Sequence, residues 1–560
     1  MLMVRRALDR PTVDRAKLGR LAGLAALAAG PLVVLTLFFL LPVAGMVGRG
    51  FVVDGTFDPL GVLEVLARPR VGRVLGFTLA SATAGTVLSL LLGLPSAYVL
   101  SRLDLPARRL VRAVLLVPFV LPTIVVGVAF RDVLGEGGPL GFLGWEQGPV
   151  AVVLGLAFFN AAVVIRTVGA AWESLDPRPG EAAAALGATP FQVLTTVTWP
   201  ALRGSVVSAT SVVFLFCATS FGVVLTLGGV RWATVETEIY LLTTSLFDLR
   251  AAAALSVLQL VVVVVLLALT ARFRAPGAPV ARRTSAPRRV RPADAPALAV
   301  TALTLAFVAL PIITLVQGSL RVGGEWSLDN YRALAGRGSD QALLVPVTDA
   351  LASSLRIAVD ATWMALGLGL LLAVVVTRRS HSPAERRVRS ALDAVFMLPL
   401  GVSAVTLGFG LLVTLDSGPL DLRDSPLLVP IAQALVALPL VVRTLVPVLA
   451  GIDDRQRQAA ASLGAGAWRT WLTVEVPVVW KPLLAASGFA FAASLGEFGA
   501  TSFLVRDEAP TLPVVIFRLL GHPGEMNYGM ALAASVVLAA TTALVMLAVE
   551  QLRVPSLGAM

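Results

Sequence analysis

Long runs of apolar residues, separated by short polar segments, recur along the whole chain. Each run is longer than about 18 residues, the length that a helix needs to cross a hydrocarbon core about 30 Å thick. Membrane-spanning strands are shorter and alternate apolar with polar positions, so the pattern indicates helices. We predict an all-α membrane protein with about twelve transmembrane helices, near residues 21–47, 72–100, 110–134, 149–172, 203–228, 250–271, 296–318, 351–377, 390–414, 427–450, 481–505 and 528–551.

The composition agrees with this prediction. Of the 560 residues, 57% are hydrophobic and 14% are charged, and the mean hydropathy is +0.85. A soluble protein of this length carries more charge. The net charge of +11 comes almost entirely from arginines. Because these arginines lie in short segments between apolar runs, they indicate membrane topology and not nucleic-acid binding.

The positions of the arginines predict the topology. Under the positive-inside rule, the arginine-rich segments are expected on the cytoplasmic side; they are residues 102–109, 272–294 and 377–389. The first apolar run, residues 21–47, is too long for the core of a signal peptide, so we expect a retained helix. We therefore expect a multi-pass protein of the plasma (cytoplasmic) membrane, surrounded by membrane lipid, with both termini in the cytoplasm.

The chain contains an internal repeat. Residues 272–294 are rich in proline, alanine and arginine and have no apolar period, so we expect a cytoplasmic linker between a first half, 1–271, and a second half, 295–560. Residues 181–200 and 458–477 share the pattern [E/Q]-A-A-x-x-L-G-A with a later V-x-x-P, at a spacing of 277 positions. Six spans in each half give parallel repeats, so both segments are expected on one aqueous face.

The repeated segment is predicted to be a helical hairpin on the cytoplasmic side. Its alanines favour helix, and Gly187 and its counterpart Gly464 allow a sharp turn. Such a hairpin offers a face of small residues that can dock into a groove of another protein. The alternative is a loop packed against its own bundle. Two copies at matching positions favour the docking interpretation.

The spacing of the repeated segment resembles the signature loop of binding-protein-dependent ABC importer permeases. The matching residues are Glu181, Ala182, Ala183, Gly187, Val197, Trp199 and Pro200 in the first half and Ala459, Ala460, Gly464, Val474, Val476 and Pro477 in the second. Gln458 stands where the family usually has Glu, and Trp199 where it usually has Leu. The resemblance implies a fused pair of type I importer permeases. It also implies that two loops couple to two copies of a P-loop ATPase, and that an extracytoplasmic protein binds the substrate.

No catalytic, cofactor or metal site is predicted in this chain. A P-loop needs Gly-Lys-Ser/Thr, but Lys17 and Lys481 precede leucine and proline. We therefore expect a transport subunit without its own ATPase site, whose partner subunit hydrolyses ATP. One cysteine, Cys217, and two distant histidines, His381 and His522, are too few for a Cys/His metal site.

Two regions resemble particular importers. Residues 216–242 and 247–260 are similar to thiamine importer permeases. Residues 494–521 are similar to the same permeases and also to ferric-iron and molybdate permeases. The resemblance implies thiamine or a thiamine phosphate as the substrate, with ferric iron or a molybdate-type anion as the alternative.

A few polar residues interrupt the apolar spans. Glu497 is placed inside the eleventh span, where a carboxylate is costly unless it is paired or hydrated. It either lines the substrate path, where it would suit a cation, or is a packing or gating residue bonded to a neighbouring helix. Ser220 is its counterpart in the first half. Asn160 is expected to join two helices, and Arg166 and Arg443 either to support the hairpins or to anchor helix ends.

Two other functions are compatible with parts of this pattern. An ion-coupled secondary transporter can also have twelve spans in two halves, but it has no need of paired glycine-containing loops. A membrane scaffold would have no transport activity at all.

Overall fold

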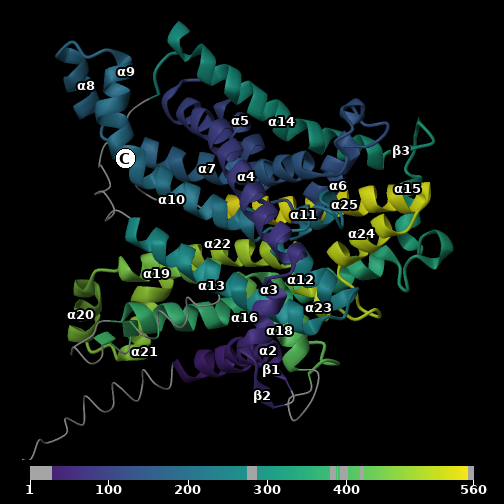
Figure 1. The fold of residues 1–560 in the computed structure, drawn as a ribbon. Helices are drawn as coiled ribbons and strands as arrows, with labels where there is room; N and C mark the ends of the chain where they lie inside the picture. Colours follow the sequence, from purple (N-terminus) through teal and green to yellow (C-terminus); the bar gives the residue numbers. More distant parts are fainter. Residues whose placement is uncertain are drawn as a thin grey trace, which may run out of the picture.

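The structure is a computed structural model that describes residues 28–552, apart from 54, 274–286, 379–385, 388, 391, 393–401 and 416–421. Within the described residues, ten helices are long and apolar enough to cross a membrane, and an eleventh candidate is a helix pair bent by 105°. These helices confirm the predicted all-α membrane fold (Figure 1). The predicted run 390–414 begins outside the described residues, and only its end, α18 (Ala404–Thr414), is seen.

The first half alternates long apolar helices with short elements at the two ends of the bundle. α5 and α6 form the bent pair, because Pro118 and Pro122 lack the amide hydrogen that a continuous helix needs there. In chain order the elements are η1 (Thr36–Leu40), α2 (Leu41–Phe51), β1 (Val52–Val53), β2 (Thr56–Phe57), α3 (Pro59–Leu66), α4 (Pro69–Arg102), α5 (Arg108–Leu116), η2 (Val117–Phe119), α6 (Thr123–Leu134), η3 (Gly141–Leu143), α7 (Pro149–Glu173), α8 (Arg178–Ala185), α9 (Pro190–Val193), η4 (Leu194–Thr198), α10 (Trp199–Ala218), α11 (Gly222–Leu227), α12 (Val235–Thr244) and α13 (Leu249–Phe273).

The second half repeats this order. Even the short π-helices η4 and η9 begin at positions that are 277 residues apart. The elements are η5 (Pro292–Asp294), α14 (Ala295–Ser319), β3 (Arg321–Val322), β4 (Glu325–Trp326), α15 (Asp329–Arg332), η6 (Ala333–Ala335), η7 (Ser339–Gln341), α16 (Val347–Thr377), α18, α19 (Leu428–Ala450), α20 (Asp454–Ser462), α21 (Ala467–Thr470), η9 (Trp471–Glu475), α22 (Val476–Leu495), α23 (Thr501–Leu504), α24 (Leu512–Gly521) and α25 (Glu525–Leu552). The antiparallel pairs β1–β2 and β3–β4 are the matching two-stranded hairpins of the two halves.

The first long helix of each half packs on the other half. α14 contacts α4, α5 and α6 of the first half, and α2 contacts α18 of the second half. Figure 1 shows α14 beside α5 and α2 near α18, at opposite sides of the molecule. This exchange joins the two halves, so the packing of each half is completed by a helix from the other.

The end of the predicted linker contacts the first half. Arg288 donates hydrogen bonds of 2.7 Å to the hydroxyl of Tyr98 and to the carboxylate of Asp294. Tyr98 also donates to Asp294 at 2.7 Å. Residues 274–286 of the linker lie outside the described residues.

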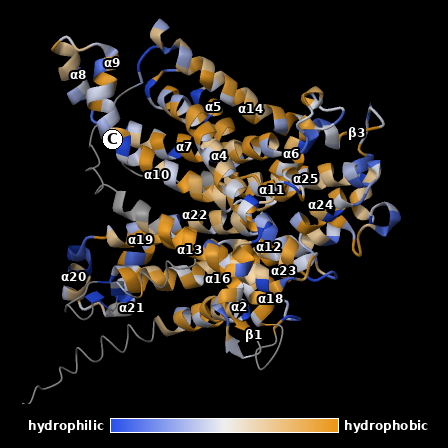
Figure 2. Ribbon diagram, in the orientation of Figure 1, coloured by the Kyte–Doolittle hydropathy of each residue, from blue (hydrophilic) through white to orange (hydrophobic). Residues whose placement is uncertain are grey.

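Polar residues gather at the two ends of the bundle, and hydrophobic residues cover the helices between them (Figure 2). One end carries the hairpins α8–α9 and α20–α21, and we call it the hairpin face (Figure 1). The other end carries β3–β4, α15 and α24, and we call it the opposite face. This distribution is the one expected of a protein whose middle is surrounded by hydrocarbon.

Matching glycines allow the long helices of each half to pack closely. A Cβ atom added at Gly93 of α4 would lie 2.7 Å from Cβ of Val164 in α7. A Cβ atom added at Gly369 of α16 would lie 2.5 Å from Cγ1 of Val441 in α19. Small residues are common at such contacts in membranes, because association there depends on close packing.

We therefore expect Gly93→Leu to destabilise the first half by about 1–3 kcal/mol, because the side chain has no space against α7. Thermal unfolding of the purified protein in detergent, followed by tryptophan fluorescence, measures the effect. Gly76→Leu in the same helix is the matched control, because a Cβ atom there meets nothing within 4 Å. Equal melting temperatures for the two variants would contradict this account of the packing.

Candidate functional site

Two helical hairpins protrude from the hairpin face at the predicted positions (Figure 1). Their turns have the same geometry. Gly187 has φ +89° and Gly464 has φ +80°, in the left-handed region that favours glycine. Each turn closes the preceding helix by the same two backbone bonds; these are Gly187 N to Ala184 O (3.0 Å) and Ala188 N to Ala183 O (3.1 Å), and Gly464 N to Ala461 O (2.9 Å) and Ala465 N to Ala460 O (3.0 Å).

The two hairpins expose equivalent apolar side chains. Leu186 is 90% exposed and its counterpart Leu463 is 89% exposed, while Phe191 and its counterpart Trp468 are 72% and 70% exposed. Exposed apolar side chains on a protruding turn are typical of a protein-docking surface. Of the predicted docking residues, Ala183 and Ala460 are half-buried, and the exposed ones are Glu181, Ala182, Gly187, Pro200, Gln458, Ala459, Gly464 and Pro477.

The hairpins differ in charge and in internal bonding. Glu181 of the first corresponds to Gln458 of the second. In the second hairpin, Arg457 donates to Asp454 at 2.8 Å and to Glu475 at 2.9 Å. Burial lowers the pKa of Arg457, but the hydrogen bonds to these two carboxylates raise it by more, so the pKa lies above its usual value. The second hairpin is therefore braced at its base by a permanent cation.

A cavity of about 610 Å³ lies between the two halves. Its lining residues nearer the hairpin face, among them Arg166, Val207 and Arg443, are exposed. Its lining residues at the other end, among them Phe221 and Phe498, are buried. The cavity is therefore open toward the hairpin face and closed toward the opposite face. Its wall is mostly apolar, and the aromatic residues in it include Phe119, Phe159, Phe216 and Phe489.

Ser220 and Glu497 both line this cavity. The prediction that Glu497 lies inside a helix is wrong, because α22 ends at Leu495. α10 likewise ends at Ala218, before Ser220. The backbone passes close to the first half here, because a Cβ atom added at Gly496 would lie 3.1 Å from the Cβ of Pro122. Non-helical backbone at membrane depth is tolerated where it lines a cavity, as it does here.

The carboxylate of Glu497 is held by the short helix that follows it. It accepts hydrogen bonds from the amide of Ala500 at 2.7 Å and of Thr501 at 3.0 Å, and a third from the Thr501 hydroxyl. It therefore caps the start of α23. Gln433 of α19 extends the network by donating to the Thr501 hydroxyl at 3.1 Å.

Three other polar residues singled out in the sequence also line the cavity. Asn160 of α7 donates to the sulfur of Cys217 in α10 at 3.3 Å, as expected of a residue that joins two helices. The guanidinium of Arg166 lies 5.5 Å from the ring centroids of Phe119 and of Phe489, so it connects the two halves. Arg443 lines the wall contributed by the second half.

Two phenylalanines, Phe221 and Phe498, close the cavity at its buried end, and three further aromatic residues pack behind them. We call the five residues the aromatic gate: Phe221, Tyr240, Phe498, Phe503 and Phe517. Phe221 stacks on its counterpart Phe498 with ring centroids 5.2 Å apart and planes inclined by 27°. Tyr240 packs edge-on against Phe221 at 5.4 Å and against its counterpart Phe517 at 6.4 Å. The pairs Phe221–Phe498 and Tyr240–Phe517 each join one half to the other. Separating the halves at this end would therefore open the gate.

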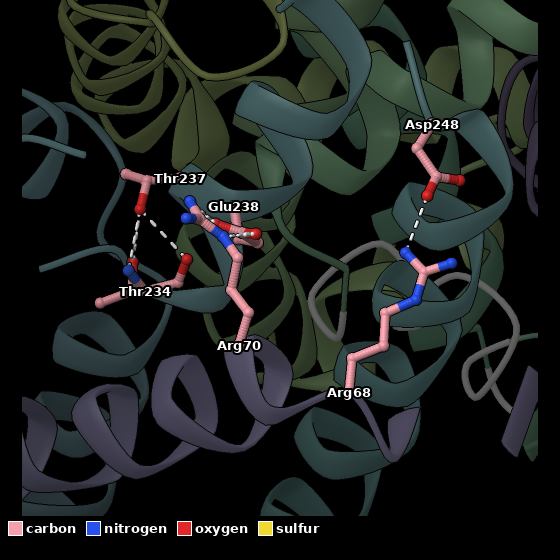
Figure 3. Close-up of polar contacts among 6 residues, drawn as sticks. All are labelled: Arg68, Arg70, Thr234, Thr237, Glu238 and Asp248. Carbon is pink, nitrogen blue, oxygen red and sulfur yellow. Dashed lines mark hydrogen bonds and ion pairs between the residues drawn. The ribbon is translucent and has the colours of Figure 1, made fainter. Parts of the chain in front are cut away.

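The helix that carries Tyr240 is fixed to the first half by ion pairs. Figure 3 shows Arg70 and Arg68, at the start of α4, reaching Glu238 of α12 and Asp248 just beyond it. Arg70 forms two bonds to the Glu238 carboxylate, of 2.5 and 2.8 Å, and Arg68 bonds Asp248 at 2.8 Å. The two-bond geometry fixes α12 in direction as well as position. Tyr240 therefore moves with the first half.

The aromatic gate was not identified in the sequence. In the sequence, a spacing of 277 positions relates Phe221 to Phe498 and also Tyr240 to Phe517. The match between Tyr240 and Phe517 is the signal from which the gate could have been found. It did not reveal that the four rings meet, because the contact depends on how the halves face one another.

Comparison with known proteins identifies related sequences over most of the chain. The family profile described as "Binding-protein-dependent transport system inner membrane component" matches residues 85–275 and again residues 365–553. The thiamine transport system permease protein ThiP of Brucella abortus (strain 2308) is 29% identical over 516 residues, which cover 90% of this chain and 89% of that protein.

Two further relatives bear the same name. The ThiP protein of Haemophilus influenzae is 26% identical over 460 residues, 80% of this chain and 82% of that protein. The ThiP protein of Escherichia coli (strain K12) is 26% identical over 468 residues, 80% of this chain and 83% of that protein.

We expect the double substitution Phe221→Ala and Phe498→Ala to open a passage through the gate, because it removes the stacked pair that ends the cavity. The measurement is leakage of a small trapped dye from proteoliposomes that contain the purified chain alone. Leakage should rise several-fold over wild type. Phe77→Ala is the control, because Phe77 packs on Trp232 in the first half, outside the cavity wall. Equal leakage from all three proteins would show that these rings do not seal the cavity.

Proposed function

The chain belongs to the family of binding-protein-dependent transport system inner membrane components, the membrane permeases of ABC importers, and we propose that it imports thiamine or a thiamine phosphate. In this proposal the hairpin face is cytoplasmic and receives two copies of a P-loop ATPase. The opposite face receives the substrate-binding protein. Both termini lie in the cytoplasm, and residues 272–294 connect the two permease halves there.

The paired hairpins support the proposed coupling. They have the same left-handed glycine, at Gly187 and Gly464, and the same exposed leucine, at Leu186 and Leu463. A dimer of identical ATPase subunits presents two equal clefts, and two equal hairpins on one face match it in number and orientation. Closure of the ATPase pair would then move the two halves against each other and expose the cavity alternately to the two faces.

Three relatives with ThiP names and the chemistry of the cavity support the proposed substrate. Thiamine carries a positively charged aromatic ring. Aromatic faces attract such cations, and the cavity wall contains several, among them Phe119, Phe159 and Phe489. Glu497 adds a carboxylate at the buried end of the cavity. Arg166 and Arg443 lie nearer its open end, where they would suit the phosphate of a phosphorylated thiamine.

The cavity fits ferric iron less well. Fe³⁺ is a hard cation that prefers several oxygen ligands, whereas this wall is mostly apolar and Glu497 is the one carboxylate among the described residues that line it. Arginines would suit a molybdate-type anion, but they do not account for the aromatic lining. We therefore place thiamine first among the substrates.

The proposed function is tested by reconstitution with the ATPase and the substrate-binding protein in proteoliposomes. Uptake of radiolabelled thiamine should require ATP on the ATPase side and should be insensitive to a protonophore. Uptake that persists without ATP and collapses with a protonophore would instead indicate a secondary transporter. Absence of both uptake and substrate-stimulated ATP hydrolysis would indicate a scaffold.

We expect Gly187→Val combined with Gly464→Val to abolish co-purification of the ATPase, because a β-branched residue does not tolerate the left-handed turn that shapes each hairpin. The permease itself should still insert, since a Cβ atom at either position meets nothing within 4 Å. Gly466→Val is the control: it adds the same side chain to the second hairpin where φ is not positive. Recovery of the ATPase at wild-type yield with the double variant would count against the proposed coupling.

A further inference from the structure

α12 places a carboxylate and an aromatic ring on one side of the helix, toward the second half. Glu236 and Tyr240 are one helical turn apart. Tyr240 belongs to the aromatic gate, where it contacts Phe503 and Phe517 of the second half. Glu236 is completely buried. Its carboxylate accepts hydrogen bonds from the amide of Gln259 and, at 2.9 Å, from the hydroxyl of Ser403.

Both partners of Glu236 are neutral. Among the described residues, no ion pair involves this carboxylate. Two helix starts lie close to it, because Glu236 is in the first turn of α12 and Ser403 caps the first turn of α18. Helix starts favour a negative charge. The two helix starts replace only part of the hydration that the carboxylate loses on burial. Buried acidic residues in membrane proteins commonly have a function.

Glu236 is hydrogen-bonded to a residue of the cavity wall. Ser403 belongs to the second half and lines the cavity wall, and its hydroxyl donates to Glu236 behind that wall. The cluster also includes Thr406, which donates to Gln259 at 3.4 Å. These two bonds, from Ser403 and Thr406, run from the second half to the first. Separation of α12 from α18 would remove them and leave the carboxylate with a free acceptor position.

The matching place in the other half has no carboxylate. The counterpart of Glu236 is Pro513, at the start of α24, and the counterpart of Ser403 is Pro122, which precedes α6. The acidic group is therefore present in one copy of the repeat only, and a single substrate molecule needs only one such group.

We propose that Glu236 and Tyr240 form a second recognition site for an aromatic cation, covered by Ser403 in this conformation and exposed when the halves separate at the aromatic gate. The proposal rests on the proposed function and extends it. The carboxylate supplies the opposite charge and the tyrosine ring a face for cation–π contact. Because the site exists only after separation, a bound cation would favour the conformation that is open to the opposite face.

The test compares two substitutions at one position, in proteoliposomes that contain the ATPase and the substrate-binding protein. Glu236→Gln keeps the length and hydrogen-bonding atoms of the side chain but removes the charge. Glu236→Asp keeps the charge but shortens the side chain. If the charge binds the substrate, thiamine uptake at low concentration should fall at least tenfold for Gln and much less for Asp. If Glu236 only joins helices, Gln should be tolerated as well as Asp or better, and that ranking would overturn the proposal.

Two controls separate the possible failures. Glu64→Gln, in α3, removes an exposed carboxylate that lines neither the cavity nor the aromatic gate. It should not raise the thiamine concentration needed for half-maximal uptake, and a rise equal to that of Glu236→Gln would overturn the proposal. Absence of uptake by the wild-type protein would instead refute thiamine as the substrate.

If both Glu236 substitutions prevent folding, Ser403→Ala provides a second test of the proposal. Ser403→Ala keeps the carboxylate and removes the hydroxyl that covers it. It should lower by several-fold the thiamine concentration at which ATP hydrolysis is half-maximally stimulated. An unchanged or higher concentration would overturn the proposal.

Discussion

The stacking of Phe221 on Phe498 holds the two halves together at the closed end of the cavity, and the arrangement of the rest of the molecule follows from it. The two parallel copies meet at this ring pair at one end of the cavity and leave a space between them toward the hairpin face. The exchange of α2 and α14 keeps the halves joined while leaving that space open. Any movement that exposes the cavity to the opposite face must separate these rings. The gate therefore links the relative position of the two halves to the face from which the cavity can be entered.

The departures from the repeat are as informative as the repeat itself. Backbone geometry is duplicated closely, as the turns at Gly187 and Gly464 show. The carboxylates of the cavity and of the gate helix are not duplicated. Glu236 corresponds to Pro513, and Glu497 to Ser220. Duplicated turns suit two identical motor subunits, whereas unpaired carboxylates suit one asymmetric substrate that passes between the halves.

Much of the fold and of the hairpins could be predicted from the sequence, because helix length and the glycine turns at 187 and 464 depend on local residue types. Three features could not. The exchange of α14 depends on packing between distant segments. The helix ends before Ser220 and Glu497 fall within continuous hydrophobic runs, which conceal them in the sequence. Arg166 lies between Phe119 of the first half and Phe489 of the second. This position depends on how the two halves pack together.

The central claim is that two equivalent hairpins receive force on the cytoplasmic side, and site-directed labelling tests it most directly. In a Cys217→Ser background, which removes the one native cysteine, Ala188→Cys and Ala465→Cys each place a thiol beside a hairpin turn. The account predicts that a membrane-impermeant maleimide labels both thiols in inside-out vesicles only, and that bound ATPase protects both. Labelling of either thiol from outside the cell, or equal labelling with and without the ATPase, would contradict it.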